Sequence, residues 1–188
     1  MKFNDEVFNE FPVLETGRLL LREITQNDVN EVYKICSSKK AMKYFGKLPF
    51  KTILEAEERI SATIDAYKNK EGIRWAITLK GSDELIGSAG IWRLVKEHFR
   101  GEIGYEIYPD YWKRGIMYEA LTEIIKFAFI KINLHTIEAN IDPKNIASEK
   151  LLLKLRFEKE GYLKESFYFN NKFDDTAIYS LRRTKKYF

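Results

Sequence analysis

Apolar and polar positions alternate along the chain with two different periods, and each period predicts a type of element. Arg18 to Ile24 is an aliphatic run typical of a strand. Three further short strands are predicted at residues 73–79, 85–94 and 102–108. A turn at residues 81–83 separates the first two of these three, so the pattern predicts an antiparallel meander in the middle of the chain.

Four other segments have helical spacing. Residues 25–28 and 52–55 both have the pattern of a capping box, and an apolar stripe of helical spacing follows each of them. A third periodic helix opens at Gly115, and a fourth is predicted at residues 147–155. An alternating strand at residues 135–141 follows the third helix, so strand, helix and strand together predict a parallel crossover.

The last segment, residues 157–182, is rich in Phe and Tyr around a turn at residues 170–172, which predicts a closing hairpin. The elements together predict an α/β (α+β) fold whose mixed, mostly antiparallel sheet has about seven strands, with about four helices. We expect a single domain over residues 1–188, with its core at about residues 14–182, because this length is usual for one domain.

Composition and charge narrow the class of protein. Hydrophobic residues make up 45% of the chain and charged residues 32%, which excludes a disordered protein. No apolar run approaches the roughly 18–20 residues that cross a bilayer, and no secretion signal is visible, so we expect a cytoplasmic protein without a membrane partner. The net charge of +4 is too small and dispersed to indicate direct nucleic-acid binding. The single cysteine, Cys36, and two distant histidines predict neither a disulfide nor a metal site.

The segment from Tyr108 to Glu119 has the clearest chemical pattern in the sequence. A strand ends there, a turn with aromatic and basic residues follows, and a long helix begins. The start of a helix exposes unpaired N–H groups and about half a positive charge, so it can bind phosphate. Lys113 and Arg114 add two cations, and Gly115 lets backbone N–H groups approach an anion. A pyrophosphate would fit this turn, but an ordinary turn with two solvated cations has the same pattern.

Three further motifs occur together with this turn. They are residues 11–22, residues 101–105, and residues 142–148 followed by Leu-Arg-Phe at residues 155–157. In this order and spacing they resemble the GNAT N-acetyltransferase superfamily, and within it the branch of ribosomal-protein alanine and serine N-terminal acetyltransferases. The resemblance extends from about Leu14 to Leu181.

The resemblance implies acetyl-CoA as co-substrate and no metal. The family's pyrophosphate loop is Gln/Arg-x-x-Gly-x-Gly/Ala; here Trp112 and Gly115 hold the first two places, and Met117 stands where Gly or Ala is expected. The family's pattern also implies that one strand end pairs its backbone with the pantetheine arm. The cofactor-binding residues implied in this way are Tyr105, Glu106, Ile107, Lys113, Arg114, Gly115, Ile116, Met117, Tyr118 and Asn145.

Direct acetyl transfer requires a neutral amine and a donor that protonates the departing thiolate. Glu102 is the first candidate for a general base, and Glu106, four residues along the same strand, is the second. A solvated strand face or a nearby arginine partner explains either glutamate equally well. Many relatives place a tyrosine acid where this chain has Leu152, which leaves Ser148 as the candidate acid. A serine that simply starts a helix is an equally good explanation of Ser148.

The resemblance predicts an acyltransferase that acetylates a primary amine, with the N-terminal α-amine of a ribosomal protein as the leading acceptor. An α-amine has a pKa of about 7.7–8.0, so roughly a tenth of it is neutral at pH 7 and a weak base suffices. A polyamine, an amino acid or an aminoglycoside is the alternative acceptor; an acidic cleft would favour a polyamine and a neutral one a peptide. Met117 and Leu152 leave open a non-catalytic acyl-CoA sensor. The residues that select the acceptor are expected in the two-helix segment and the final hairpin, where no motif applies. The sequence leaves the oligomeric state open, and a homodimer is one possibility.

Overall fold

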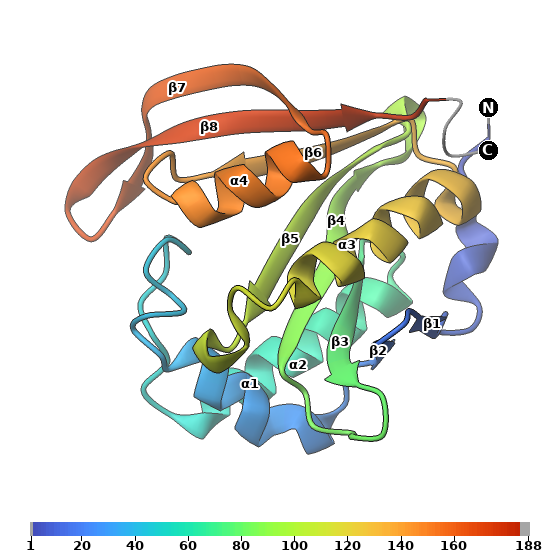
Figure 1. Ribbon diagram of the computed structural model, residues 1–188, viewed down its shortest axis with the longest axis horizontal. Helices are drawn as coiled ribbons and strands as arrows, with labels where there is room; N and C mark the ends of the chain where they lie inside the picture. The colour runs from blue at the N-terminus through green and yellow to red at the C-terminus, as the bar shows by residue number, and fades with distance from the viewer. Residues whose placement is uncertain (1, 185–188) are drawn as a thin grey trace.

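A computed structural model describes residues 2–184 of the chain. Its strands form one eight-stranded sheet in the order β1-β2-β3-β4-β5-β6-β8-β7 (Figure 1). All neighbours are antiparallel except β5 and β6, which are parallel. The strands are β1 Leu14–Glu15, β2 Leu19–Glu23, β3 Ile73–Leu79, β4 Gly87–Val95, β5 Arg100–Ile107, β6 Thr136–Ile141, β7 Glu158–Phe169 and β8 Lys172–Arg182.

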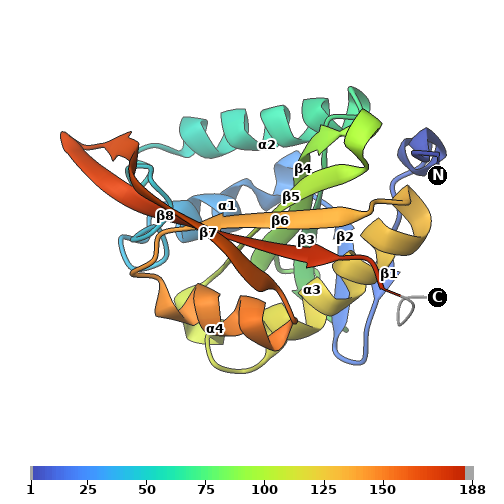
Figure 2. The same ribbon diagram turned by 90° about the horizontal axis from the view of Figure 1, so that it is seen from above.

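Helices cover both faces of the sheet. Figure 2 shows α1 and α2 on one side and α3 and α4 on the other. None of the helices within residues 2–184 is long and apolar enough to cross a membrane. The α-helices are α1 Val29–Cys36, α2 Ile53–Lys68, α3 Ile116–Phe127 and α4 Ile146–Lys154; the short helical turns are η1 Asp5–Phe8, η2 Gln26–Asp28, η3 Lys96–His98, η4 Pro109–Tyr111 and the π-helical η5 Ala128–Ile132.

The predicted mixed α/β fold is confirmed. The parallel crossover from β5 through α3 to β6 and the closing hairpin are both present. The sheet has one strand more than expected, because the two-residue β1 pairs with β2 at the sheet edge. So short a strand has too few residues to show an alternating pattern.

Strand β3 is buried on both faces and separates two apolar clusters. Trp75 belongs to the cluster beneath α3, and its neighbour Ala76 to the cluster beneath α1 and α2. Successive strand residues point to opposite faces, so one strand contributes to both cores. Cys36 is buried in the second cluster.

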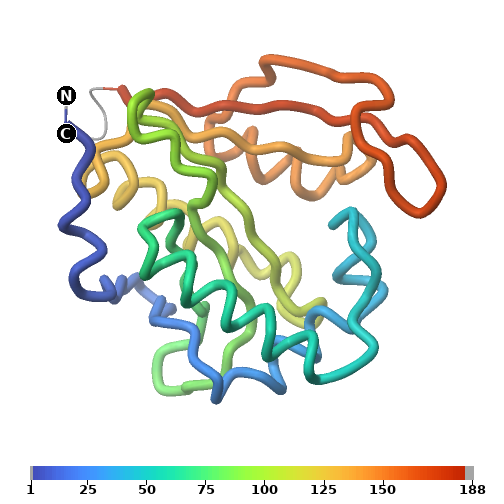
Figure 3. Tube along the Cα trace, turned by 180° about the vertical axis from the view of Figure 1, so that it is seen from behind, coloured from blue at the N-terminus to red at the C-terminus, as the bar shows by residue number. Residues whose placement is uncertain are grey.

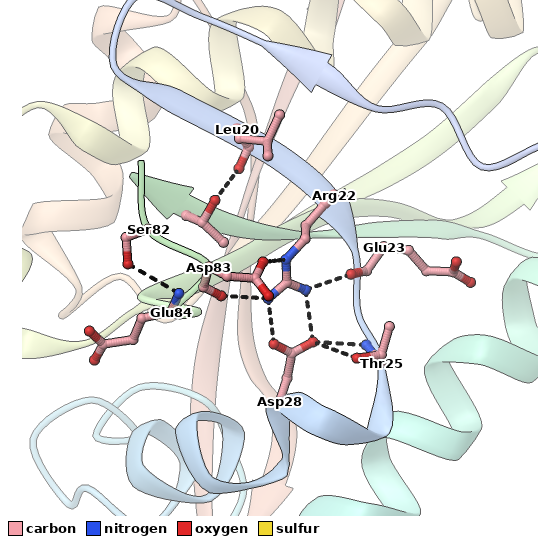
Figure 4. A network of polar contacts seen from close by, with 9 residues as sticks. Leu20, Arg22, Glu23, Thr25, Asp28, Ser82, Asp83 and Glu84 are labelled. Carbon is pink, nitrogen blue, oxygen red and sulfur yellow. Dashed lines mark hydrogen bonds and ion pairs between the residues drawn. The ribbon is translucent and has the colours of Figure 1, made fainter. Parts of the chain in front are cut away.

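Arg22 connects the strand β2 to the two-helix segment that follows it (Figure 4). Its guanidinium donates two hydrogen bonds to the Asp28 carboxylate, at 2.7 and 2.9 Å, one to the Asp83 carboxylate at 2.6 Å and one to the Asp83 backbone carbonyl at 2.7 Å. The hydrogen bond to Asp28 raises the pKa of Arg22. Asp28 also accepts a hydrogen bond from the backbone N–H of Thr25, so the capping box predicted at the start of α1 is built around this ion pair.

Candidate active site

The candidate residues gather where β5 and β6 separate. The two strands pair from Arg100 with Thr136 to Glu102 with Glu138, and no described strand pairs with this edge of β5 beyond Glu102. Figures 1 and 3 show the strands diverging, with β5 running to the start of α3 and β6 to α4. Backbone N–H and C=O groups along an unpaired strand edge can pair with an extended ligand.

The side chains of β5 alternate between the two faces of the sheet. Glu102 and Glu106 lie on the side of α1 and α2, where Glu106 contacts Arg59 of α2. Tyr105 lies on the opposite side, where its hydroxyl contacts Ser148 of α4. The predicted base candidates and the predicted acid therefore come from opposite faces of the same opening.

The turn before α3 forms an exposed cradle of backbone donors. Gly115 is the N-cap of α3 and has a left-handed φ of 74°, and Lys113 has a positive φ of 60°. The first N–H groups of a helix have no acceptor within it, so those of Ile116 and the two residues after it face outward at this end. Lys113 and Arg114 are exposed beside them. This geometry suits an anion, with the positive end of the α3 dipole behind it.

Arg18 is a further cation at this turn, and the sequence pattern did not assign it a role. Its guanidinium donates to Glu119 of α3 at 2.7 Å and to the backbone carbonyl of Arg114 at 3.1 Å. A Cβ at Gly115 would lie 3.6 Å from its Nη2 atom. The only sign of this role in the sequence is Glu119, an acidic residue in the first turn of α3. Glu119 accepts the hydrogen bond from Arg18 although the two residues are 101 positions apart.

Met117 does not cover the cradle. Its side chain is 8% exposed and packs in the main apolar cluster together with Ile116. Tyr118 is partly buried against the same cluster, and the Lys154 ammonium of α4 lies 4.3 Å from its ring centre. The departure from the family motif at residue 117 therefore places a side chain in the core rather than over the N–H groups.

The start of α4 brings Asn145, Ser148 and Tyr105 together. Asn145 is the N-cap, and its side-chain oxygen accepts a hydrogen bond from the Ser148 N–H at 3.1 Å. The Ser148 hydroxyl is buried and lies 2.6 Å from the Tyr105 hydroxyl. Burial raises the pKa of Tyr105 to about 12, so its phenol stays protonated. Leu152, where many relatives carry a tyrosine, is fully buried.

Glu106 is the centre of a buried ion-pair cluster. It accepts hydrogen bonds from Arg59, from Arg74 at 3.2 Å and from the Ser88 hydroxyl at 2.5 Å. Although burial acts in the opposite direction, the two guanidinium groups and the Ser88 hydroxyl lower its pKa to about 2. A carboxylate with so low a pKa, occupied by three donors, is a weak base. Its side chain holds the two arginines, which leaves Glu102 as the better-placed base candidate.

Glu102 lies at one end of a pocket of about 550 Å³ on the α1–α2 side of the sheet. The connection between α1 and α2, strands β4 to β6 and the β7–β8 hairpin line this pocket. Glu102 is 9% exposed and accepts a hydrogen bond from Arg93 at 3.1 Å. Burial raises its pKa above the usual value, against the effect of Arg93. A buried carboxylate with a raised pKa facing a pocket is suited to proton transfer.

The two segments expected to choose the acceptor meet at the far side of this pocket. A Cβ on Gly46, in the α1–α2 connection, would lie 2.5 Å from the Phe167 ring of β7. Figures 1 and 3 show this connection beside the hairpin tip, although the two are far apart in sequence. Only a residue without a side chain allows this approach, and its φ of 63° also favours glycine.

Most carboxylates of the pocket have cationic partners. The ion pairs join Glu102 to Arg93 at 3.1 Å, Glu138 to Arg100 at 3.9 Å, and Asp174 to both Lys144 and Lys172 at 2.8 Å.

A family comparison agrees with this geometry. The model of the acetyltransferase (GNAT) domain matches residues 18–158 of the chain. The chain belongs to the GNAT family. This GNAT protein is 37% identical over 176 residues to the uncharacterized N-acetyltransferase YoaA of Bacillus subtilis (strain 168), covering 94% of this chain and 99% of YoaA. It is 34% identical over 116 residues, 60% of each chain, to the ribosomal protein uS5-alanine N-acetyltransferase of Escherichia coli (strain K12).

A solved structure has the same fold as this chain. Spermidine N-acetyltransferase from Vibrio cholerae, in complex with CoA and spermine, superposes with a TM-score of 0.80 at 22% identity, over 92% of this chain and 99% of that one. Membership of the GNAT family confirms the predicted acyltransferase class, whose members use acetyl-CoA. The cradle before α3 fits such a donor, since it offers free N–H groups, an open glycine and three cations, Arg18, Lys113 and Arg114, to a pyrophosphate.

Proposed function

We propose that this GNAT acetyltransferase transfers the acetyl group of acetyl-CoA to the N-terminal α-amine of a protein, with ribosomal proteins as the first acceptors to test. The observation that supports this choice is the charge of the pocket: three of the five carboxylates that line it, Glu102, Glu138 and Asp174, are paired with cations. A polyamine needs several unpaired carboxylates, whereas a peptide N-terminus carries one charge. The 34% identity to the uS5-alanine N-acetyltransferase agrees with this choice.

The proposed position of acetyl-CoA follows the opening between β5 and β6. The pyrophosphate would bind the cradle at Lys113, Arg114 and Gly115, with Arg18 beside it. The pantetheine arm would pair with the free backbone edge of β5 from Tyr105 to Ile107, as an added strand does. In this position the thioester lies between the acceptor pocket on one face and Ser148 on the other.

In the proposed reaction the neutral amine nitrogen forms a bond to the thioester carbonyl carbon, and the carbon–sulfur bond breaks. Glu102 accepts the proton that the amine loses, directly or through one water. The Ser148 hydroxyl donates a proton to the CoA thiolate. The Tyr105 hydroxyl, 2.6 Å from Ser148, is close enough to return that proton and regains one from solvent. An α-amine demands little of the base, which suits a carboxylate already held by Arg93.

The test is CoA thiol release from acetyl-CoA with a panel of amines. The panel contains peptides that begin with Ala or Ser, the same peptides with a blocked N-terminus, spermidine, free amino acids and an aminoglycoside. We expect turnover with the unblocked peptides and none with the blocked peptides, spermidine or the aminoglycoside. Turnover with spermidine or the aminoglycoside but not with peptides would overturn the proposal. Acetyl-CoA binding without any turnover would indicate a sensor instead of an enzyme.

A small cationic amine is the second candidate acceptor, and one observation favours it. Asp142 and Asp175 line the same pocket and have no cation within ion-pair distance in residues 2–184. Asp175 accepts a hydrogen bond from the Tyr162 hydroxyl at 2.5 Å. This neutral donor does not cancel the negative charge of the Asp175 carboxylate. Spermidine in the panel tests this candidate directly, and Asp175→Asn should then raise the KM for spermidine without changing acetyl-CoA binding.

A further inference from the structure

Two N–H donors converge over Gly104 on the pocket side of β5. A Cβ at Gly104 would lie 3.1 Å from Nη2 of Arg74 and 3.6 Å from Nε1 of Trp92. Gly104 is partly exposed and its backbone is ordinary extended strand, and the absence of a side chain allows the two N–H groups to approach it. Within the described residues neither Nη2 of Arg74 nor Nε1 of Trp92 has a hydrogen-bond acceptor.

The sheet register explains how the donors reach this point. Arg74 lies opposite Gly90 on β4, and Gly90 lies opposite Gly104 on β5. With no side chain on either glycine, the Arg74 side chain can lie across the sheet face toward β5. Its Nη1 atom is fixed by Ser88 at 2.8 Å and Glu106 at 3.2 Å, which orients the planar guanidinium and leaves Nη2 beside Gly104.

The charge around these donors favours an oxygen ligand. Arg59 and Arg74 share the single carboxylate of Glu106, so the cluster has an excess positive charge. Their side chains are 25% and 22% exposed, so part of this charge is accessible to a ligand. A carboxylate or a polarised carbonyl oxygen would be stabilised here, and an ammonium group would be repelled.

The donors lie next to the proposed base. Glu102 precedes Gly104 by two residues on the same face of β5, about 6.6 Å away along the strand. Trp92 is directly opposite Glu102 in the register, and both side chains line the pocket. A ligand whose amine contacts Glu102 therefore has its next atoms within reach of Arg74 and Trp92.

We propose that Arg74 and Trp92 form a subsite that binds an oxygen atom of the acceptor. This oxygen belongs to the carbonyl or carboxylate group attached directly to the amine-bearing carbon. The acceptor class is then the α-amino carbonyl compounds, which are peptide N-termini and amino acids. This inference rests on the proposed function, because it places the acceptor amine beside Glu102. Polyamines have no such oxygen and would bring a second ammonium group toward Arg74.

The experiment compares acceptors that differ only at this oxygen. Alanyl peptide, alaninamide, alanine and isopropylamine share the same amine-bearing carbon and methyl group, but isopropylamine has no carbonyl. Rates are expressed per neutral amine, to correct for their different pKa values. We expect isopropylamine to be the poorest acceptor. A preference for alanine over alaninamide assigns the oxygen to a carboxylate, and the reverse assigns it to a peptide carbonyl.

Trp92→Phe is the decisive variant, because Trp92 is 43% exposed and phenylalanine keeps an aromatic ring without the N–H donor. We expect kcat/KM for the alanyl peptide to fall about 5- to 10-fold, as for the loss of one hydrogen bond. Isopropylamine turnover and the Kd for acetyl-CoA should not change. Arg74→Met should have a larger effect of the same kind, and Arg182→Met, on an exposed arginine of β8, is its matched control.

The outcomes separate this inference from the proposed function. Peptides are acetylated in two outcomes that overturn the subsite and leave the proposed function standing. In one, Trp92→Phe lowers turnover of the peptide and of isopropylamine equally; in the other, it lowers turnover of neither acceptor. If wild-type protein acetylates isopropylamine as well as the alanyl peptide, the subsite is again refuted. Acetylation of spermidine with no α-amine acetylated overturns both.

Discussion

Glu106→Gln tests whether the buried Glu106 serves as the partner of two half-buried arginines. The described residues offer Arg59 and Arg74 no other carboxylate within ion-pair distance. Glutamine keeps the shape of the side chain but removes the charge. Two guanidinium groups would then lie close together beneath α2 without a counter-ion, and breaking a buried pair in this way costs about 3–5 kcal/mol.

The pKa of Glu106 gives an independent figure. It is lowered from 4.5 to about 2, and a difference of about 2.5 units corresponds to about 3 kcal/mol of unfolding free energy. Because the folded-state pKa is the lower one, this stability is present above pH 4.5 and is lost as the pH falls toward 2. By pH 3 about 2 of the 3 kcal/mol should be gone.

The assay is urea unfolding of both proteins at pH 7 and pH 3, followed by tryptophan fluorescence. We expect the variant to be about 3 kcal/mol less stable at pH 7, and the difference to shrink to about 1 kcal/mol at pH 3. Glu123→Gln is the control, because its exposed pair with Lys126 should contribute less than about 1 kcal/mol. A loss below about 1 kcal/mol at pH 7, or an equal loss at both pH values, would refute the reasoning.

Three further variants test the site. Gly115→Glu should abolish acetyl-CoA binding in calorimetry, because it adds a side chain and a negative charge at a left-handed position; Gly81→Glu, at a similar φ of 85° in an open turn, should bind normally. Glu102→Gln should lower kcat about 100-fold and remove the part of the acidic limb of the pH profile that belongs to Glu102, which lies above pH 4.5 because burial raises that pKa, while the part that belongs to deprotonation of the amine should remain; unchanged turnover would assign the base role to water. Ser148→Ala should lower kcat about 100-fold in stopped-flow thiol release without changing the Kd for acetyl-CoA, and an unaltered kcat would mean that Ser148 only starts α4.

The order of elements follows from local patterns in the sequence. Strand β3 was predicted with its observed ends, and the helix α3 was predicted to open at Gly115 and begins at Ile116. Both are local features: strand periodicity and the freedom of glycine at a helix start act over a few residues. The turn before α3 could be predicted for the same reason, since Lys113, Arg114 and Gly115 are adjacent in the chain.

The partners of the charged and polar side chains depend on tertiary structure. Arg18 reaches Glu119 from 101 residues away, Tyr105 reaches Ser148 across 43, and Arg59 meets Glu106 across 47. Nothing in a local pattern distinguishes Glu102 from Glu106, because both are acidic positions on one face of one strand. Their surroundings differ only because α2 places Arg59 over Glu106, while Glu102 pairs with Arg93 and lines a pocket.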